Sequence, residues 1–378
     1  MKTNIIVFLL TFIASVFSQC KKDTNPYVTI PDDNFLNALI ELGVDKNSDG
    51  IISSGEAAEI NYLDISWRNI SNLKGIELFV NLDTFICYVN QLTRLDLSKN
   101  HQLVYLDCGR NLLTSLDVSN NTALSYLVCS PNLLTSLNVS NNLELTHLYC
   151  CDNSLTSLDV SNSPALVILD SGNNLLSSLD VSNQSVLNML FCYDNLLTSL
   201  DVSNNHELGR LYCGGNLLTS LDVSNNPALT DLGCAPNLLT SLNVSNNLSL
   251  YVLGCSGNQL TSLDISNNHE LGRLYCSGNK LTSLDVSNNP ALYMLNCEDN
   301  LLTSLDLSNN PKLSWELSCG DNLLTNLDIS NNTSIEYLSL TSMHSLYKVC
   351  VWTMPFPPAG VAVDTTGSPN VYFTMECD

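Results

Sequence analysis

The sequence repeats a unit of 21 residues through its central part. NHELGRLYCGGNLLTSLDVSN occupies residues 205–225, and NHELGRLYCSGNKLTSLDVSN follows 63 residues later, at 268–288, with only two changes. Since 63 is three times 21, the two stretches indicate a shorter unit that is itself reiterated. A fixed period of this length is the signature of stacked repeat architectures, so it restricts the fold more than any other feature.

A cysteine keeps the register of the repeat. It stands in the pattern L-x-x-L-x-C-x-x-N-x-L, and the Asn three residues after it is present in all twelve units. The cysteine column consists of Cys87, Cys108, Cys129, Cys150, Cys192, Cys213, Cys234, Cys255, Cys276, Cys297 and Cys319. Ser171 replaces the cysteine once, and the last cysteine comes one residue late. Such a register predicts that each unit is one coil of a solenoid.

Both halves of the unit predict a short strand. Leu and Cys at alternate positions have the period of two expected of a strand buried on one face. The second half, close to LTSLDVSNN in every unit, has the same shape, so each coil is expected to contain two extended segments that end at Asn corners. A buried Asn amide can donate to and accept from the neighbouring turn. The sequence therefore predicts a repeat solenoid over residues 63–345, with parallel β-sheets and little helix.

These units resemble leucine-rich repeats of the bacterial surface kind, and the cysteine column is similar to the cysteine ladder of the J-type internalins. The resemblance covers about residues 80–340 and implies the leucine-rich repeat fold. Because internalins are cell-wall adhesins, it also implies recognition or adhesion at a cell surface.

The inward-facing thiols of the cysteine column are expected to stay free. A disulfide needs converging Cβ vectors, whereas parallel strands in register aim neighbouring side chains the same way. A buried thiol packs as a small hydrophobic group. Disulfides between coils remain an alternative, as does a metal array, for which the column lacks zinc-type His or Cys spacing. Cys350 and Cys377 flank a tail rich in Pro, Gly and strand-forming residues, predicted to be a β-rich C-terminal cap (346–378) that a Cys350–Cys377 disulfide secures.

The N-terminal segment predicts export. MKTNIIVFLLTFIASVFSQC has a lysine, an apolar run and a short polar exit, which is typical of a signal peptide, here residues 1–19. The following CKKD resembles the start of bacterial lipoproteins and implies a lipid on Cys20 as the membrane anchor. Gln19 departs from the small residue that such signals prefer, so secretion with an unmodified Cys20 is the alternative.

A calcium loop precedes the repeats. DKNSDGIISSGE fits the pattern D-x-[DN]-x-[DN]-G-x5-E of an EF-hand loop at every fixed position. Calcium takes six to eight hard oxygen ligands. The candidate ligands are the side chains of Asp45, Asn47, Asp49, Ser53 and Glu56 and the carbonyl of Ile51. Helical patterns flank the loop, so residues 26–62 are predicted to form an EF-hand-like helical cap with one structural Ca²⁺. An acidic surface turn is the alternative.

The net charge of −23 argues against nucleic acid and anionic lipid as partners, because both would repel the chain. No nucleophile motif, phosphate loop or zinc pair occurs, so the chain is not expected to be an enzyme. We expect a monomer.

An acidic column occupies one outward position in the second half of the coils. It consists of Asp96, Asp117, Asp159, Asp180, Asp201, Asp222, Asp264, Asp285, Asp306 and Asp328, interrupted by Asn138 and Asn243. Two interpretations stay open: a solvated polar face, or a stripe that binds calcium weakly.

Aromatic and arginine side chains vary at the outward positions of the first half. They are Tyr105, Tyr126, His147, Tyr149, Phe191, Tyr193, Arg210, Tyr212, Arg273 and Tyr275. Exposed Tyr and Arg dominate binding hot spots. The sequence therefore predicts a surface protein that recognises a protein partner through these residues. The alternatives are a glycan-binding protein, since stacked Tyr can hold sugar rings, and a structural surface protein whose rings only cover the sheet.

Overall fold

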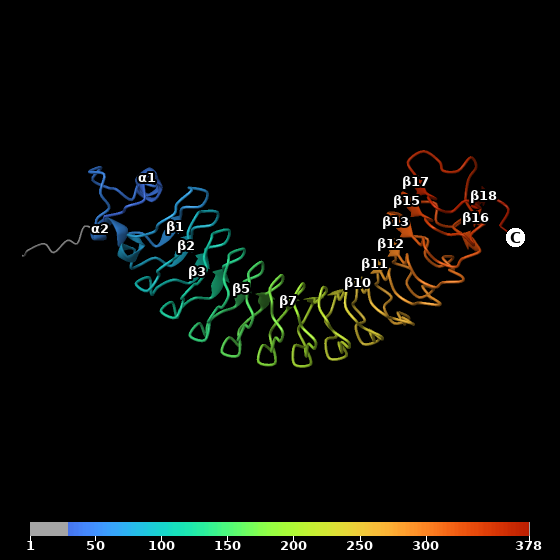
Figure 1. The fold of residues 1–378 in the computed structure, drawn as a ribbon, viewed down its shortest axis with the longest axis horizontal. Helices are drawn as coiled ribbons and strands as arrows, with labels where there is room; N and C mark the ends of the chain where they lie inside the picture. The colour runs from blue at the N-terminus through green and yellow to red at the C-terminus, as the bar shows by residue number, and fades with distance from the viewer. Residues whose placement is uncertain (1–28, 378) are drawn as a thin grey trace, which may run out of the picture.

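The computed structural model describes residues 29–377, which form a curved solenoid (Figure 1). The predicted signal peptide and Cys20 lie outside the described residues. Within 29–377, no helix has both the length and the hydropathy needed to cross a membrane.

One sheet of 15 parallel strands follows the concave side of the arc (Figure 1). Its strands are β1 (Tyr62–Asp64), β2 (Thr84–Ile86), β3 (Tyr105–Asp107), β4 (Tyr126–Val128), β5 (His147–Tyr149), β6 (Ile168–Asp170), β7 (Met189–Phe191), β8 (Arg210–Tyr212), β9 (Asp231–Gly233), β10 (Val252–Gly254), β11 (Arg273–Tyr275), β12 (Met294–Asn296), β13 (Glu316–Ser318), β15 (Tyr337–Ser339) and β17 (Ala362–Asp364). Equivalent residues of successive coils pair directly. The predicted solenoid of parallel strands is thus confirmed.

The core is a stack of identical layers. From β3 to β13 the central residue of each strand is a buried Leu, such as Leu211, and every member of the cysteine column is buried as well. The column cysteines carry free thiols, and burial raises the pKa of Cys213 well above its ordinary value. Such thiols stay protonated and act as apolar fillers.

The Asn three residues after each column cysteine joins its own coil to the preceding coil. Asn216 Oδ1 accepts from the Leu197 N–H at 2.9 Å, and Nδ2 donates to the carbonyls of Cys192 at 2.9 Å and Cys213 at 3.1 Å. The residue before this Asn adopts a left-handed conformation in most coils, as Gly215 does at φ 65°. Gly, Asp and Asn, which tolerate that conformation, therefore recur there.

The second half of the coil forms isolated bridges, such as Asp96 with Asp117, where the sequence predicted a continuous sheet. The cause is local. The Asp96 carboxylate accepts the N–H of Ser98 at 3.0 Å, which turns the chain after one bridged residue. Full pairing on one side and sparse pairing on the other accompany the curvature in Figure 1.

The C-terminal region extends the solenoid. A second sheet joins β14 (Asn326–Asp328), β16 (Lys348–Cys350) and β18 (Tyr372–Thr374) on the convex side, while β17 continues the concave sheet (Figure 1). The segment predicted as a cap therefore supplies another coil. Cys350 and Cys377 are joined by a disulfide, with Cα atoms 5.4 Å apart.

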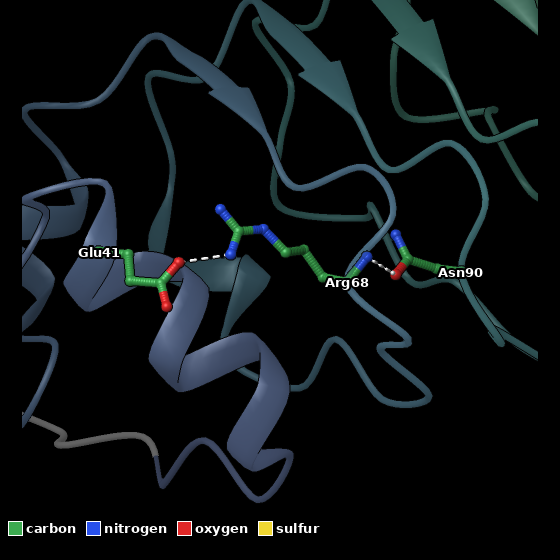
Figure 2. A network of polar contacts seen from close by, with 3 residues as sticks. All are labelled: Glu41, Arg68 and Asn90. Atoms are coloured by element: carbon green, nitrogen blue, oxygen red, sulfur yellow. Dashed lines mark hydrogen bonds and ion pairs between the residues drawn. The ribbon is translucent and has the colours of Figure 1, made fainter.

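Helices begin the described chain. They are α1 (Asp33–Glu41), α2 (Ser54–Ala57) and the 3₁₀ turn η1 (Ile76–Leu78). Asp32 caps α1 by accepting the Phe35 N–H at 3.1 Å, and its other oxygen accepts the N–H of Ser71 at 2.8 Å. Figure 2 shows a second link to the solenoid, in which Glu41 pairs with Arg68, whose backbone N–H donates to Asn90 Oδ1 at 3.2 Å. The helical segment is thus fixed to the first coils.

Candidate functional site

The concave sheet presents most of the predicted binding residues. Nine of the ten occupy outward positions of its strands, where flanking residues are half-buried and the central Leu points inward. The tenth, Tyr193, lies two residues beyond the end of β7. A Cβ at Gly172 would lie only 2.4 Å from the Tyr193 ring, so this ring packs directly against the Gly172 backbone.

The first aromatic cluster lies near the N-terminal end of the sheet. Tyr105 stacks on Tyr126 at 4.6 Å between ring centroids, and Tyr126 stacks on His147 at 4.8 Å. These separations match the spacing of paired strands, so register alone brings the rings together. Tyr149 leans on Tyr126 at 5.6 Å. Burial raises the pKa of Tyr105 and Tyr149 and lowers the pKa of His147, so all three are neutral hydrogen-bonding groups at pH 7.

The middle of the sheet combines rings with charge. Phe191 stacks on Tyr212 at 5.5 Å. Beside them, Arg210 Nε lies 3.7 Å from a carboxylate oxygen of Asp231 on the next strand, and the Arg210 side chain remains half exposed. This pair is loose enough for Arg210 to exchange Asp231 for a carboxylate of a partner.

A third cluster surrounds Arg273, and the sequence indicated only its arginine. The guanidinium carbon lies 5.3 Å from the Tyr293 ring centroid and 5.7 Å from that of Trp315, and Nε donates to the Tyr293 hydroxyl. Tyr251 approaches Tyr293 at 6.3 Å. We call Tyr251, Arg273, Tyr293 and Trp315 the arginine cluster.

Gly272 makes the arginine cluster possible. A Cβ at this residue would lie 2.6 Å from the Tyr251 ring and 3.0 Å from the Tyr293 ring. The three aromatic residues stand one position before a strand, outside the alternating pattern that marks outward strand residues. One sequence signal could have revealed this cluster: three successive coils carry an aromatic residue, a glycine and an aromatic residue at the same position, namely Tyr251, Gly272 and Tyr293.

The acidic column performs a backbone task. Its carboxylates accept the N–H of the Ser two residues later, as Asp180 does from Ser182 at 2.9 Å. Asn138 and Asn243, which interrupt the column, make the same hydrogen bond through Oδ1. An uncharged acceptor therefore suffices, which favours the polar-face interpretation.

Replacement of Asp180 tests this role. Hydrogen bonds from the Ser182 hydroxyl and N–H hold the pKa of Asp180 below its ordinary value of 3.8, so its contribution to stability is present above that pH and declines as the pH falls below it. We expect the free energy of unfolding of D180N, measured in urea at pH 7, to lie within about 0.5 kcal/mol of the parent value. D180A should be slightly less stable than D180N, because alanine offers no acceptor to the Ser182 N–H. A large loss in D180N, or its loss of calcium binding, would support the ionic stripe instead.

Side-chain oxygens of the predicted calcium loop accept hydrogen bonds from backbone N–H groups of the same loop. Asp45 accepts the Gly50 N–H at 2.9 Å, Asn47 accepts the Asp49 N–H at 2.9 Å, and Asp49 accepts the Ile51 N–H at 2.9 Å. These bonds curl the loop, and Gly50 adopts φ 77° at its tightest point.

Glu56 secures the end of this loop. One carboxylate oxygen accepts the Lys46 N–H at 2.8 Å, and the other accepts the N–H and hydroxyl of Ser53, which in turn caps α2. These bonds lower the pKa of Glu56 to about 2. The donor set of carboxylates, one amide, one hydroxyl and the Ile51 carbonyl consists of the hard oxygens that Ca²⁺ prefers.

Elsewhere in residues 29–377, a group of metal-ligating atoms within 4.8 Å of one another occurs at Asp328, Cys350 and Cys377. The two cysteines there are already joined to each other, so they offer no thiolate to a metal. His147 Nδ1 lies 2.9 Å from the Thr146 hydroxyl, its chain neighbour.

Three solved structures place this geometry among known proteins. The functional domain of InlJ from Listeria monocytogenes, which includes a cysteine ladder, is 38% identical to this chain, covers 86% of it and 76% of its own length, and has a TM-score of 0.76. The leucine-rich repeat protein LIC12759 of Leptospira interrogans is 26% identical over 71% of this chain and 75% of its own, with a TM-score of 0.67. YopM, a leucine-rich effector protein from Yersinia pestis, is 25% identical over 88% and 98%, with a TM-score of 0.68. No protein-family model and no curated protein matches the chain.

Proposed function

Because this chain belongs to the leucine-rich repeat proteins, we propose that it is a binding protein that recognises a protein partner through the concave sheet. Solenoid curvature creates an extended concave surface suited to a macromolecule. The proposed role is recognition or adhesion, not catalysis.

One observation carries this proposal: the arginine cluster gathers the side chains typical of hot spots on the concave side. The Arg273 guanidinium lies over the rings of Tyr293 and Trp315, and Trp315 is 53% exposed. Tyr, Trp and Arg supply most of the binding energy in protein interfaces. A guanidinium fixed by aromatic rings loses little freedom when it meets a carboxylate.

Variation along the sheet supports the same conclusion. At one outward position, β3 to β13 carry Tyr, His, Ile, Met, Arg, Asp, Val or Glu, while the backbone register does not change. The fold therefore accepts side chains of different size, polarity and charge there. Selection for a partner explains why aromatic and arginine residues cluster.

Location and calcium complete the proposal. The N-terminal segment 1–20 supports export to the cell surface of a bacterium, with a lipid on Cys20 as anchor. The oxygens of Asp45, Asn47, Asp49, Ile51, Ser53 and Glu56 support one structural Ca²⁺. The loop ends at α2, whose cap is Ser53, so the ion would stabilise the start of the solenoid.

A binding screen tests the proposed function. The chain is presented to panels of extracellular protein domains and glycans with calcium, and each hit is repeated with R273A, Y126A and Y347A. Tyr347 is 50% exposed but precedes β16 of the convex sheet, so it is the matched control. We expect R273A or Y126A to weaken a protein hit by about tenfold or more and Y347A to leave it unchanged. Equal binding by all variants would refute a role for the concave sheet.

Glycan binding is the second candidate, because Phe191 and Tyr212 form a stacked, half-buried platform. Retention on polysaccharide columns that is lost in Y212A, without a protein hit, would favour it. If the concave sheet proves dispensable for every interaction, the chain is a structural surface protein.

A further inference from the structure

Positive side chains are scarce in this protein, yet three of them meet at one cavity. The chain has 14 Lys and Arg against 37 Asp and Glu. Lys74, Arg94 and Lys99 line a cavity of about 460 Å³ beside the first coils. Its lining residues come from two adjacent connections, residues 72–77 between β1 and β2 and residues 94–99 between β2 and β3, so the cavity is separate from the strands of the concave sheet.

The repeat shows that the fold does not require two of these charges. Residues 92–100 read LTRLDLSKN, whereas the later coils read close to LTSLDVSNN. All eleven later coils carry Ser or Asn at the position of Arg94, and all carry Asn at the position of Lys99. Both departures occur in the same coil and line the same cavity.

A cavity near the other end of the solenoid gives an internal comparison. Asn326 and Asn331 occupy the coil positions of Arg94 and Lys99 there, and the cavity measures about 200 Å³. Asp306 and Asp328 are the charged residues that line it. The same place in the coil is thus acidic at one end and basic at the other.

The three cations are available to a ligand. Among the described residues, ion pairs within 4.0 Å join Arg68 to Glu41 and Arg210 to Asp231, and none involves Lys74, Arg94 or Lys99. All three side chains belong to exposed residues.

The two acids of the same cavity are engaged by the backbone. Glu77 accepts the Gly75 N–H at 2.7 Å, and Asp96 accepts the Ser98 N–H at 3.0 Å. These bonds orient both carboxylates. Asp96 also attracts Lys99 electrostatically, but neither acid forms an ion pair within 4.0 Å with the three cationic side chains.

We propose that this cavity binds a small multivalent oxyanion, a phosphate or sulfate group. An arginine can bind two oxygens of such a group at once, and two lysines add point charges. A chain with net charge −23 does not need these cations for its solubility, and the repeat shows that the fold does not need Arg94 or Lys99. An oxyanion ligand explains why they are present.

The experiment compares two double variants that remove equal charge. R94S/K99N restores the repeat sequence at the cavity. K280L/K312A restores it elsewhere, because Leu217 and Ala228 occupy the positions equivalent to Lys280 and Lys312. Each replacement is already used by other coils, so both proteins should fold, which circular dichroism verifies. Inorganic phosphate and inorganic sulfate are titrated into each full chain by calorimetry at low salt.

The parent and K280L/K312A are expected to bind at least one anion equally, within about twofold, and R94S/K99N to bind it at least about tenfold more weakly. If one of the two anions binds more tightly, it identifies whether the cavity prefers a phosphate or a sulfate group. The proposal is overturned if neither anion binds, if R94S/K99N binds like the parent, or if both double variants weaken binding equally.

Discussion

The N216S variant is expected to lose about 3–5 kcal/mol in its free energy of unfolding. Asn216 is buried, and its amide satisfies the Leu197 N–H and the carbonyls of Cys192 and Cys213. A serine is too short to reach all three groups. Each buried polar group left without a partner costs about 1–3 kcal/mol. Urea unfolding followed by circular dichroism measures the loss.

The matched control is N226S, in the other buried Asn column. Asn226 Nδ2 donates to the carbonyls of Val202 and Asn205, both at 2.9 Å. In this column Ser163 and Gln184 already replace Asn, and the Ser163 hydroxyl still donates to the Asn142 carbonyl at 3.5 Å. N226S should therefore cost only about 1–2 kcal/mol. Equal losses in the two variants would contradict the assigned role of Asn216.

The second large effect is expected from Glu56. E56Q should bind Ca²⁺ at least about tenfold more weakly than the parent, because the loop loses a carboxylate ligand. The control E59Q removes an equal charge from an exposed neighbour and should leave affinity unchanged. Calorimetric titration with Ca²⁺ measures both. Unchanged binding in E56Q, or none in the parent, would exclude the proposed site.

Without calcium, Glu56 should also make the cap sensitive to acid. Its pKa falls from 4.5 to about 2 through bonds from Ser53, Lys46 and Asn47, so its stabilising effect is fully present above pH 4.5 and is lost as the pH falls towards 2. In E56A the three N–H groups lose their acceptor, and the cap should lose about 1–3 kcal/mol at pH 7. Hydrogen exchange of the amides of Lys46 and Ser53 measures this local opening. If E56A and the parent exchange alike, Glu56 does not hold the loop.

Much of the fold was predictable because each coil meets a near copy of itself. A residue such as Leu211 faces its equivalents on both sides, so one pattern fixes strand register, core and corner for every coil. Stacking of Tyr105 on Tyr126 followed from the same register.

The end of the solenoid was harder to predict. Tyr337 of β15 pairs with Ala362 of β17, 25 residues later, so the period of 21 is broken by an insertion. The chain still returns to the sheet, because β17 completes the backbone hydrogen bonds that β15 would otherwise leave open.

The sequence by itself determined the solenoid, the buried thiols and the Asn corners, since these depend on contacts between equivalent positions of adjacent coils. Only the tertiary structure decided how non-equivalent positions meet. Arg273 reaches Tyr293 and Trp315 because Gly272 leaves space for rings from both sides. Lys74 joins Arg94 and Lys99 only because adjacent coils enclose a cavity. Such contacts depend on side-chain direction and curvature, which a repeat pattern does not contain.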